Sequence, residues 1–320
     1  MFARVTVFRA AVAQVRATSR TADAVEKVAL AAEQAKTQRA ELVVFPEALL
    51  GGYPRGAAFG AVIGDRSVMG RDEFLAYSRN AVTIPGHEVD RLAEIARENG
   101  LHLVVGLIER VGTTLYCGAV TIDDAGKVVG VRRKVMPTGS ERLVWAQGDG
   151  STLCVTPTRL GTLATAICWE NLMPALRMSF YAQGAEIWCA PTADARDVQL
   201  ATMRHIAVEG RCFVLAANQV ARAKDLSPDF DTGYDDPDAV VCRGGSAIVD
   251  PFGNVLAGPL HDDEGLLVAE VDLSEVTRGR YDFDAAGHYS RPDLFTLTVD
   301  TRVRAPVEWH TGEDVVPSEQ

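Results

Sequence analysis

The sequence has no long hydrophobic run and no surplus of positive charge. No apolar stretch approaches the roughly 18 residues that a membrane-spanning helix requires. Residues 1–19 alternate polar and apolar side chains, unlike the core of a signal peptide. The formal net charge of −11 argues against nucleic acid or an anionic membrane as a partner, because both require a basic patch. We therefore expect a cytoplasmic protein that handles small molecules.

The cysteines lack the spacing of a disulfide framework or a zinc site, since no two of them form a Cys-x-x-Cys pair. The six are Cys117, Cys154, Cys168, Cys189, Cys212 and Cys242. Cys154, Cys189 and Cys212 lie in or beside apolar runs, so we interpret them as small buried core residues. The pattern implies no metal and no cofactor, and a reactive thiol has to be identified from its surroundings.

No Pro/Gly/Ser-rich linker and no internal repeat divides the chain. Its hydrophobic content of 47% is enough for a large core. We predict a single domain over residues 1–304 and a polar tail or arm over residues 305–320. Residues 221–241 are rich in Asp and Pro, and we expect them to form a surface loop.

Short apolar runs alternate with stretches of helical periodicity, which is typical of an α/β fold. Helices are predicted at residues 21–39, 89–96, 172–183 and 196–211. Residues 115–133 have the pattern of a hairpin that turns at residues 123–126. Strands are predicted at residues 9–15, 42–45, 101–108, 115–122, 128–133, 162–167, 186–190, 213–218, 245–249 and 266–271.

Glu47 is the first candidate for chemistry. It follows a strand-like run, Leu-Val-Val-Phe at residues 42–45, and Pro46. Since proline cannot donate to a sheet ladder, the strand should end there and leave Glu47 at its carboxyl end, where open α/β sheets bind ligands. An isolated Glu in this position is more often an exposed loop residue. The tight Gly-Gly-Tyr-Pro sequence at residues 51–54 instead favours a shaped loop.

Lys134 ends a second strand-like run, shortly before Pro137. Only five of the 32 basic residues are lysines, so composition alone does not explain a Lys at this point. A solvated basic cluster is the alternative interpretation. Glu141 follows seven residues later, at the start of a loop that can return a second carboxylate toward the lysine.

Cys168 lies between an apolar run, residues 163–167, and a helical sequence. At such a strand-to-helix turn a sulfur can face a cleft, and unpaired backbone N–H groups can hold a developing anion. A single Cys in this position is more often structural. However, the three segments share one layout, in which a Glu, a Lys or a Cys follows a strand. Together they supply a base, a fixed cation and a nucleophile, so we predict an active site built around Cys168.

These three motifs, in this order, resemble those of the nitrilase superfamily of carbon-nitrogen hydrolases over almost the whole chain. The matching segments are residues 45–47, 133–142 and 168–171. Lys-Val-Met-Pro-Thr and Cys-Trp-Glu-Asn are similar to the nitrilase branch, as are the segments at residues 145–150, 244–246, 250–253, 256–259 and 287–293.

The resemblance implies a four-layer α-β-β-α sandwich of the nitrilase type. It implies Glu47 as general base, Lys134 as cationic stabiliser and Cys168 as nucleophile. Glu141 would be an auxiliary carboxylate that positions Lys134 or the substrate. Because members of the family pair through helices next to the nucleophile, and nitrilases extend such dimers into spirals, we expect the protein to self-associate.

The implied reaction is hydrolysis of an organic nitrile to a carboxylic acid and ammonia through a thioimidate and a thioester on Cys168. Lys134 and the Trp169 backbone N–H would stabilise the negative charge that develops on nitrogen. Trp169 has core packing as its alternative role. The expected pocket walls are Tyr53, Thr138, Trp169, Pro191 and Thr192.

His87, His205 and His288 lack the spacing of metal ligands and do not follow a strand end, so we interpret them as structural. Two further hypotheses remain open. One keeps the Glu-Lys-Cys apparatus but assigns it to a cyanide hydratase or an amide hydrolase. The other is a non-catalytic assembly protein, which the presence of all three catalytic residue types disfavours.

Overall fold

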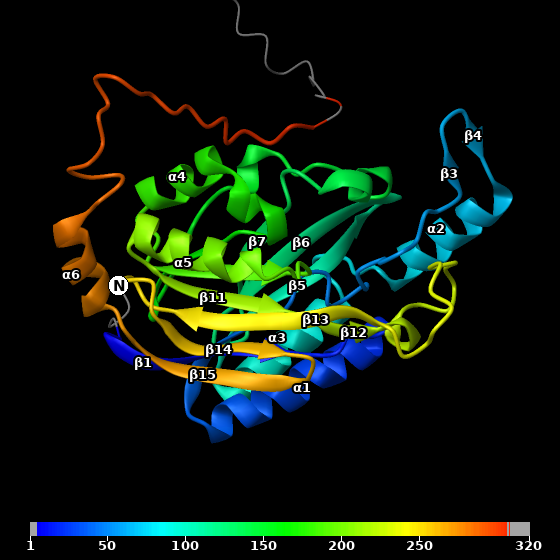
Figure 1. Cartoon of the computed structure of the whole chain (residues 1–320), viewed down its shortest axis with the longest axis horizontal. Coiled ribbons are helices and arrows are strands. Elements are labelled where there is room, and N and C mark those ends of the chain that lie inside the picture. The colour runs from blue at the N-terminus through cyan, green and yellow to red at the C-terminus, as the bar shows by residue number, and fades with distance from the viewer. Residues whose placement is uncertain (1–4, 306, 308–320) are drawn as a thin grey trace, which may run out of the picture.

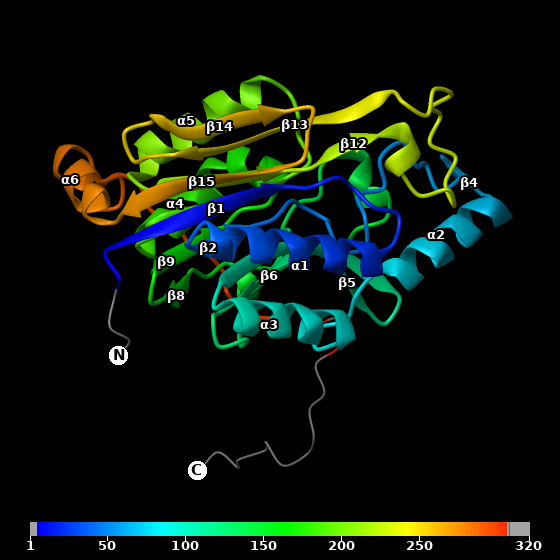
Figure 2. The same ribbon diagram turned by 90° about the horizontal axis from the view of Figure 1, so that it is seen from below.

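A computed structural model describes residues 5–305 and 307, and it contains two mixed β-sheets that pack face to face (Figures 1 and 2). The first sheet has the order β15-β1-β2-β5-β6-β7, and the second has β12-β13-β11-β10-β9-β8, with β14 paired to β13. The first comprises β1 (Val7–Gln14), β2 (Ala40–Val44), β5 (His102–Val111), β6 (Thr114–Ile122), β7 (Val128–Arg133) and β15 (Gly265–Asp272). The second comprises β8 (Thr156–Thr158), β9 (Gly161–Thr165), β10 (Ile187–Thr192), β11 (Phe213–Asn218), β12 (Val220–Arg222), β13 (Val240–Val249) and β14 (Val255–His261).

Helices cover the outer face of each sheet, which gives the order helix, sheet, sheet, helix (Figure 2). Helices α1 (Thr21–Thr37) and α3 (His87–Asn99) pack on the first sheet. Helices α4 (Pro174–Ala182) and α5 (Val198–Gly210) pack on the second. The predicted α/β class is confirmed. Outside these layers lie α2 (Val68–Asn80), α6 (Ser274–Asp282) and a small hairpin of β3 (Ala61–Val62) and β4 (Asp65–Arg66).

The middle strands are buried on both faces, which explains why they have continuous apolar runs. In β2, Val43 packs outward against α1 and α3, while Leu42 and Val44 pack inward against the second sheet. In β10, Trp188 faces α4 and α5, and Ile187 faces the inter-sheet core. Because successive side chains of a strand point to opposite faces, each middle strand contributes both to the core between the sheets and to the core under the helices.

The layers bring the ends of distant strands together between the sheets. β1, β2 and β5 run parallel in the first sheet, as do β9, β10 and β11 in the second. Glu47 follows the end of β2, Lys134 directly follows β7, and Cys168 follows β9. Thr192 is the last residue of β10. This end of the sandwich therefore holds the three segments that carry Glu47, Lys134 and Cys168.

Several sequence-based expectations need correction. Cys154 is exposed rather than buried, because it follows the short 3₁₀-helix η2 (Gly150–Thr152) on the surface. Cys189 and Cys212 are buried as expected. Helix α2 was missed because it buries few residues and so has only a weak apolar stripe. The expected loop at residues 221–241 starts inside β12, forms the 3₁₀-helix η4 (Ala223–Asp225), and ends in β13.

After α6 the chain runs without helix or strand over residues 283–305, beside α4 (Figure 1). Its end is anchored where the Arg304 backbone N–H donates to Asp149 at 2.7 Å. Most of the predicted tail at residues 305–320 lies outside the described residues. Within residues 5–305 and 307, no helix combines the length and the apolar character needed to cross a bilayer.

Candidate active site

Lys134 joins two carboxylates in the interior. Its Nζ donates to Glu47 Oε1 at 2.7 Å and to Glu141 Oε2 at 2.8 Å. The side chains of Lys134 and Glu47 are completely buried, and that of Glu141 is nearly so. An ammonium has three N–H donors, so these two bonds leave one donor for a further partner. The indole of Trp145 adds a cation–π contact, with its ring centroid 5.6 Å from Nζ.

Burial raises the pKa of Glu47, and the negative charge of Glu141 adds to the effect, although the Lys134 ammonium opposes it. Burial would lower the pKa of Lys134, but the charges of Glu47 and other neighbours outweigh it, so this pKa is raised. Lys134 therefore stays cationic. Glu47 Oε2 has no hydrogen-bond partner among the described residues, which leaves one oxygen of this carboxylate free to take a proton.

Cys168 begins the 3₁₀-helix η3 (Cys168–Leu172) in a left-handed backbone conformation, with φ of 53°. A non-glycine residue adopts this region only when its surroundings impose it, and such strain is common at functional sites. A contact with the Cys168 thiol lowers the pKa of Glu47, which works against the larger effect of burial. The thiol is also contacted by the Thr192 hydroxyl and the Ala193 backbone N–H. Burial raises the pKa of Cys168, and the charge of Glu47 raises it further. The resting sulfur is therefore a neutral thiol.

Glu170 ties the lysine segment to the cysteine segment. Its Oε1 accepts from Arg132 Nη2 at 2.8 Å and from the Val135 backbone N–H at 2.7 Å. Its Oε2 accepts from the Ile167 backbone N–H at 2.8 Å. Because Val135 follows Lys134 and Ile167 precedes Cys168, one completely buried carboxylate fixes the backbone beside both of these side chains. Asn171 adds a bond from Nδ2 to the Cys168 carbonyl at 2.7 Å.

Glu141 and Glu170 are placed by the same local device. Each is the third residue of a short 3₁₀-helix and accepts the backbone N–H of the residue that precedes the helix, as in a capping box. For Glu141 the donor is Thr138, at 2.5 Å, and the helix is η1 (Gly139–Leu143). Local sequence therefore aims both carboxylates back into the site.

Aromatic side chains form the wall behind Glu141. Tyr53 Oη donates to Glu141 Oε1 at 2.7 Å, and its ring meets Trp145 edge-on at 5.6 Å between centroids. Trp145 Nε1 donates to Tyr77 Oη at 3.0 Å, and Tyr77 Oη donates to the Gly52 carbonyl at 3.0 Å. Burial, together with the charges of Glu47 and Glu141, raises the Tyr53 pKa, so Tyr53 remains a neutral donor.

The structure places the other expected pocket residues at different distances from the chemistry. Thr192 contacts the Cys168 thiol, and Pro191 is buried next to it in β10. Thr138 contributes its backbone N–H to Glu141. Trp169 is 40% exposed, so it is not a core residue. Its Nε1 donates to Asp194 Oδ2 at 2.9 Å, and the Arg196 guanidinium lies 4.7 Å from its ring.

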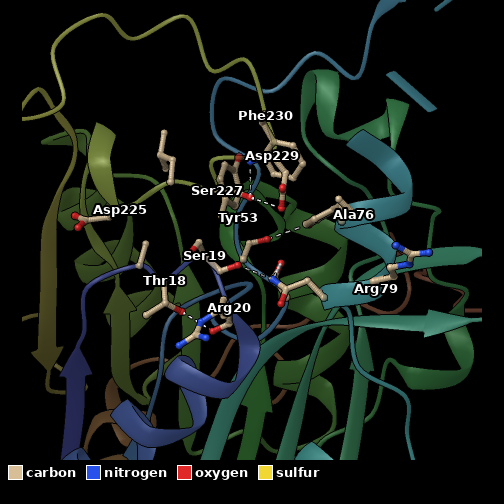
Figure 3. A pocket seen from close by; sticks show the side chains of 16 residues that line it. Thr18, Ser19, Arg20, Tyr53, Ala76, Arg79, Asp225, Ser227, Asp229 and Phe230 are labelled. Carbon is tan, nitrogen blue, oxygen red and sulfur yellow. Dashed lines mark hydrogen bonds between the residues drawn. The ribbon is translucent and has the colours of Figure 1, made fainter. Parts of the chain in front are cut away.

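Three cavities adjoin these residues. One of about 230 Å³ includes Cys168, Trp169 and Thr192. Another of about 370 Å³ includes Tyr53 and Glu141. A third of about 240 Å³ shares Tyr53 but contains none of Glu47, Lys134 and Cys168. Figure 3 shows this third cavity, where side chains from the β1–α1 link, Tyr53, α2 and the loop at residues 225–230 converge.

Sequence reasoning missed Arg132, Ala193 and any role for Glu170. Ala193 acts through its backbone N–H, which no side-chain pattern can reveal. Glu170 carried one available signal, since it stands three residues after Ile167 in the position of a capping-box acceptor. The histidines His87, His205 and His288 are all exposed, and none contacts Glu47, Lys134 or Cys168 in the described part of the chain.

The chain belongs to the carbon-nitrogen hydrolase family, whose pattern matches residues 9–281. The fold agrees, since a carbon-nitrogen hydrolase from Helicobacter pylori superposes with a TM-score of 0.72 at 22% identity, covering 91% of this chain and 97% of that one. An amidase from Nesterenkonia sp. gives a TM-score of 0.64 at 23% identity, with coverage of 86% and 94%.

Within the family, the chain is similar to nitrilases. A nitrilase of Bradyrhizobium diazoefficiens is 52% identical, over 88% of each chain. An aliphatic nitrilase of Sinorhizobium fredii is 48% identical over 94% of this chain and 98% of its own. A bifunctional nitrilase/nitrile hydratase of Nicotiana tabacum is 51% identical over 86% of this chain and 81% of its own. The resemblance to the nitrilase branch is confirmed.

Proposed function

We propose that this protein is a nitrilase that hydrolyses an organic nitrile to a carboxylic acid and ammonia. The observation that supports this most directly is the contact network of one thiol, one ammonium and one carboxylate with a free oxygen. Glu47 contacts both Lys134 and Cys168. The names of relatives that are about half identical over most of the chain point to the same activity.

In the first step Cys168 Sγ attacks the nitrile carbon, and Glu47 takes the thiol proton. One π-electron pair of the triple bond moves to nitrogen, which takes the thiol proton from Glu47, so that the product is a covalent thioimidate and Glu47 is a carboxylate again. The remaining N–H of Lys134 stabilises the charge on nitrogen, and the Trp169 backbone N–H, at the start of η3, is the second donor in this proposal. Because the thiol is neutral at rest, attack and proton transfer occur together.

Hydrolysis then needs two water molecules. Glu47 takes a proton from the first as it adds to the thioimidate carbon, and passes that proton to the nitrogen. The new hydroxyl then gives up its proton, again through Glu47, and the nitrogen leaves as ammonia, which gives a thioester. The second water adds in the same way, the carbon–sulfur bond breaks, and the acid departs as Cys168 regains its proton. If the carbon–sulfur bond breaks before ammonia leaves, the product is the amide. Glu141 holds Lys134 in place through both stages.

A panel of aliphatic, arylacetic and aromatic nitriles tests the proposal, with ammonia, acid and amide measured for each. We expect ammonia and acid in equal amounts from at least one group. Cyanide and the matching amides belong in the same panel, because turnover of these alone would identify a cyanide hydratase or an amide hydrolase instead. The Nicotiana tabacum relative is named as bifunctional, so amide is the by-product to quantify.

Electrophilic labelling of Cys168 separates these enzymes from a non-catalytic assembly protein. We expect stoichiometric labelling that substrate slows. A thiol that is inert to labelling, in a chain that hydrolyses none of the panel, would favour the assembly role.

We also propose that residues 1–304 form one domain with an arm at residues 305–320, and that the protein works in the cytoplasm as a dimer or a larger spiral. Exposed apolar side chains on the helices next to Cys168 support self-association, among them Leu172, Val198 and Val208. Light scattering on the purified chain, with Val198→Asp as the test variant, measures the oligomer. A monomeric wild-type protein would contradict this part of the proposal.

A further inference from the structure

Arg55 is a half-buried cation without an acidic partner. Its Nη2 donates to the Ala193 carbonyl at 2.8 Å, and its guanidinium lies 5.0 Å from the Tyr53 ring centroid. In the described part of the chain no carboxylate lies within ion-pair distance of it. By contrast, Arg132 and Arg196 near the same site each pair with a carboxylate. A guanidinium has five N–H donors, so most of those of Arg55 are unused.

Arg55 lines the cavity of about 370 Å³ that also contains Tyr53 and Glu141. Glu141 cannot serve as the missing partner, because its oxygens already accept from Tyr53, Lys134 and the Thr138 backbone. Phe59, Leu143 and Val144 contribute apolar side chains to the same wall. The cavity therefore offers one cation with spare donors and one carboxylate that is already satisfied.

One residue in space separates Arg55 from Glu141 on one side and from Cys168 on the other. On one side it stacks on Tyr53, which bonds Glu141 and through it Lys134. On the other side it holds the carbonyl of Ala193, whose backbone N–H contacts the Cys168 thiol. Arg55 is thus linked through Tyr53 to Glu141 and through Ala193 to Cys168, although Arg55 and Cys168 line different cavities.

We propose that Arg55 binds a carboxylate carried by the nitrile substrate, so that the enzyme prefers nitriles with an anionic substituent. This rests on the proposed nitrilase function. A guanidinium presents paired N–H groups that match a carboxylate, and the contact strengthens where water is partly excluded. The net charge of −11 repels anionic substrates at long range, so the preference comes from this local contact.

The decisive measurement is the ratio of kcat/KM for a charged substrate to kcat/KM for its uncharged ester. ω-Cyano carboxylates of increasing chain length are compared with their methyl esters, which keep the length and lose the charge, and kcat/KM is measured by ammonia release. For the chain length that spans from Cys168 to Arg55, we expect the wild type to favour the acid over the ester about tenfold or more. Arg55→Gln keeps a donor for the Ala193 carbonyl but loses the charge, and should remove most of that preference, mainly through KM.

Two controls isolate the charge. Arg55→Lys keeps it and should retain part of the preference. Arg142→Gln removes an exposed arginine whose side chain donates to the Gly139 carbonyl, so the ratio should stay at the wild-type value. If the Arg55 variants do not fold, inhibition of the wild type by pentanoate against its methyl ester gives the same comparison of a charged with an uncharged molecule.

A wild type that hydrolyses neutral nitriles but shows no preference for the acids would overturn the role of Arg55 and leave the nitrilase function intact. An equal loss for acids and esters in Arg55→Gln would mean that Arg55 only holds Ala193. Failure of every nitrile, charged or neutral, would overturn the proposed function itself.

Discussion

Glu47 and Glu170 are two completely buried carboxylates at the same end of the sandwich, but they are bonded in opposite ways. Glu170 accepts three hydrogen bonds, shared over both oxygens, and faces a buried arginine. Glu47 shares its ammonium with a second carboxylate, and one of its oxygens has no hydrogen-bond partner among residues 5–305 and 307. A satisfied carboxylate stabilises the fold, whereas an unsatisfied one is ready to bind a proton.

The same contrast applies to the charges. Arg132 is buried beside Glu170, so this pair is balanced. Around Glu47, two carboxylates share Lys134, and burial raises the pKa of Glu47. The first cluster should therefore contribute to stability and the second to reactivity. Substitutions that remove one charge from each cluster test this division.

The largest effect is expected for Cys168→Ala, which removes the proposed nucleophile. Turnover should fall by roughly 10⁴-fold or more, because every step passes through the sulfur. Stability should change little, since one small side chain at a strained backbone position is lost. Ammonia release and a thermal melt measure both. Cys154→Ala, which removes an exposed thiol, is the control and should match the wild type. Wild-type turnover by Cys168→Ala would rule out its role as nucleophile.

Glu47→Gln tests whether the cluster around Glu47 serves reactivity. It keeps the shape and an acceptor for Lys134 but removes the base, so kcat should fall roughly 10²- to 10⁴-fold. Stability should be unchanged or higher, because one of two buried negative charges disappears. Denaturant unfolding and steady-state kinetics on one preparation measure the two effects. If the variant is inactive because it is strongly destabilised, Glu47 stabilises the fold and the comparison with Glu170 fails.

Glu170→Gln tests whether the cluster around Glu170 serves stability. The buried Arg132 loses its counter-ion, and one of the three donors faces an amide N–H₂ group instead of an oxygen. We expect the free energy of unfolding to fall by roughly 3 kcal/mol, as for other broken buried ion pairs. The folded fraction should retain measurable turnover at low temperature, with its pH dependence unchanged. Full stability with an altered pH profile would instead give Glu170 a direct role in proton transfer.

The smallest effect is a shift in pH dependence. Glu47 must be deprotonated to accept a proton, so activity is lost as pH falls through its pKa. Since burial raises that pKa, the acid limb of kcat/KM should lie above the ordinary value of 4.5. The charge of Glu141 raises it further, so Glu141→Gln should move the limb to lower pH. A limb that stays in place, or moves up, would show that another group controls it.

The pattern of strands and covering helices could be predicted because burial on one or both faces leaves a direct trace in the sequence. The run at residues 42–45 and the stripe of α1 are examples. Helix α2 left too weak a trace, because among its residues only Gly70, Glu73 and Tyr77 are buried. Cys154 was misjudged because apolar neighbours in sequence do not establish that a residue is covered in space.

That Glu47, Lys134 and Cys168 lie close together was predictable from their shared place after strand ends and from the family motifs. Their partners were less accessible. The unused donors of Arg55, the Ala193 N–H and the bond of Tyr53 to Glu141 depend on which loops meet. No spacing rule connects residues 55 and 193, since they follow strands of different sheets.

The sequence by itself determined the alternation of strands and helices, the side chains that end particular strands, and the capping positions of Glu141 and Glu170, because these depend on residues close together in the chain. Only the tertiary structure decided which carboxylate is satisfied and which is left reactive. That outcome depends on the packing of two sheets, since burial sets the cost of a charge and the loops that meet there supply its partners.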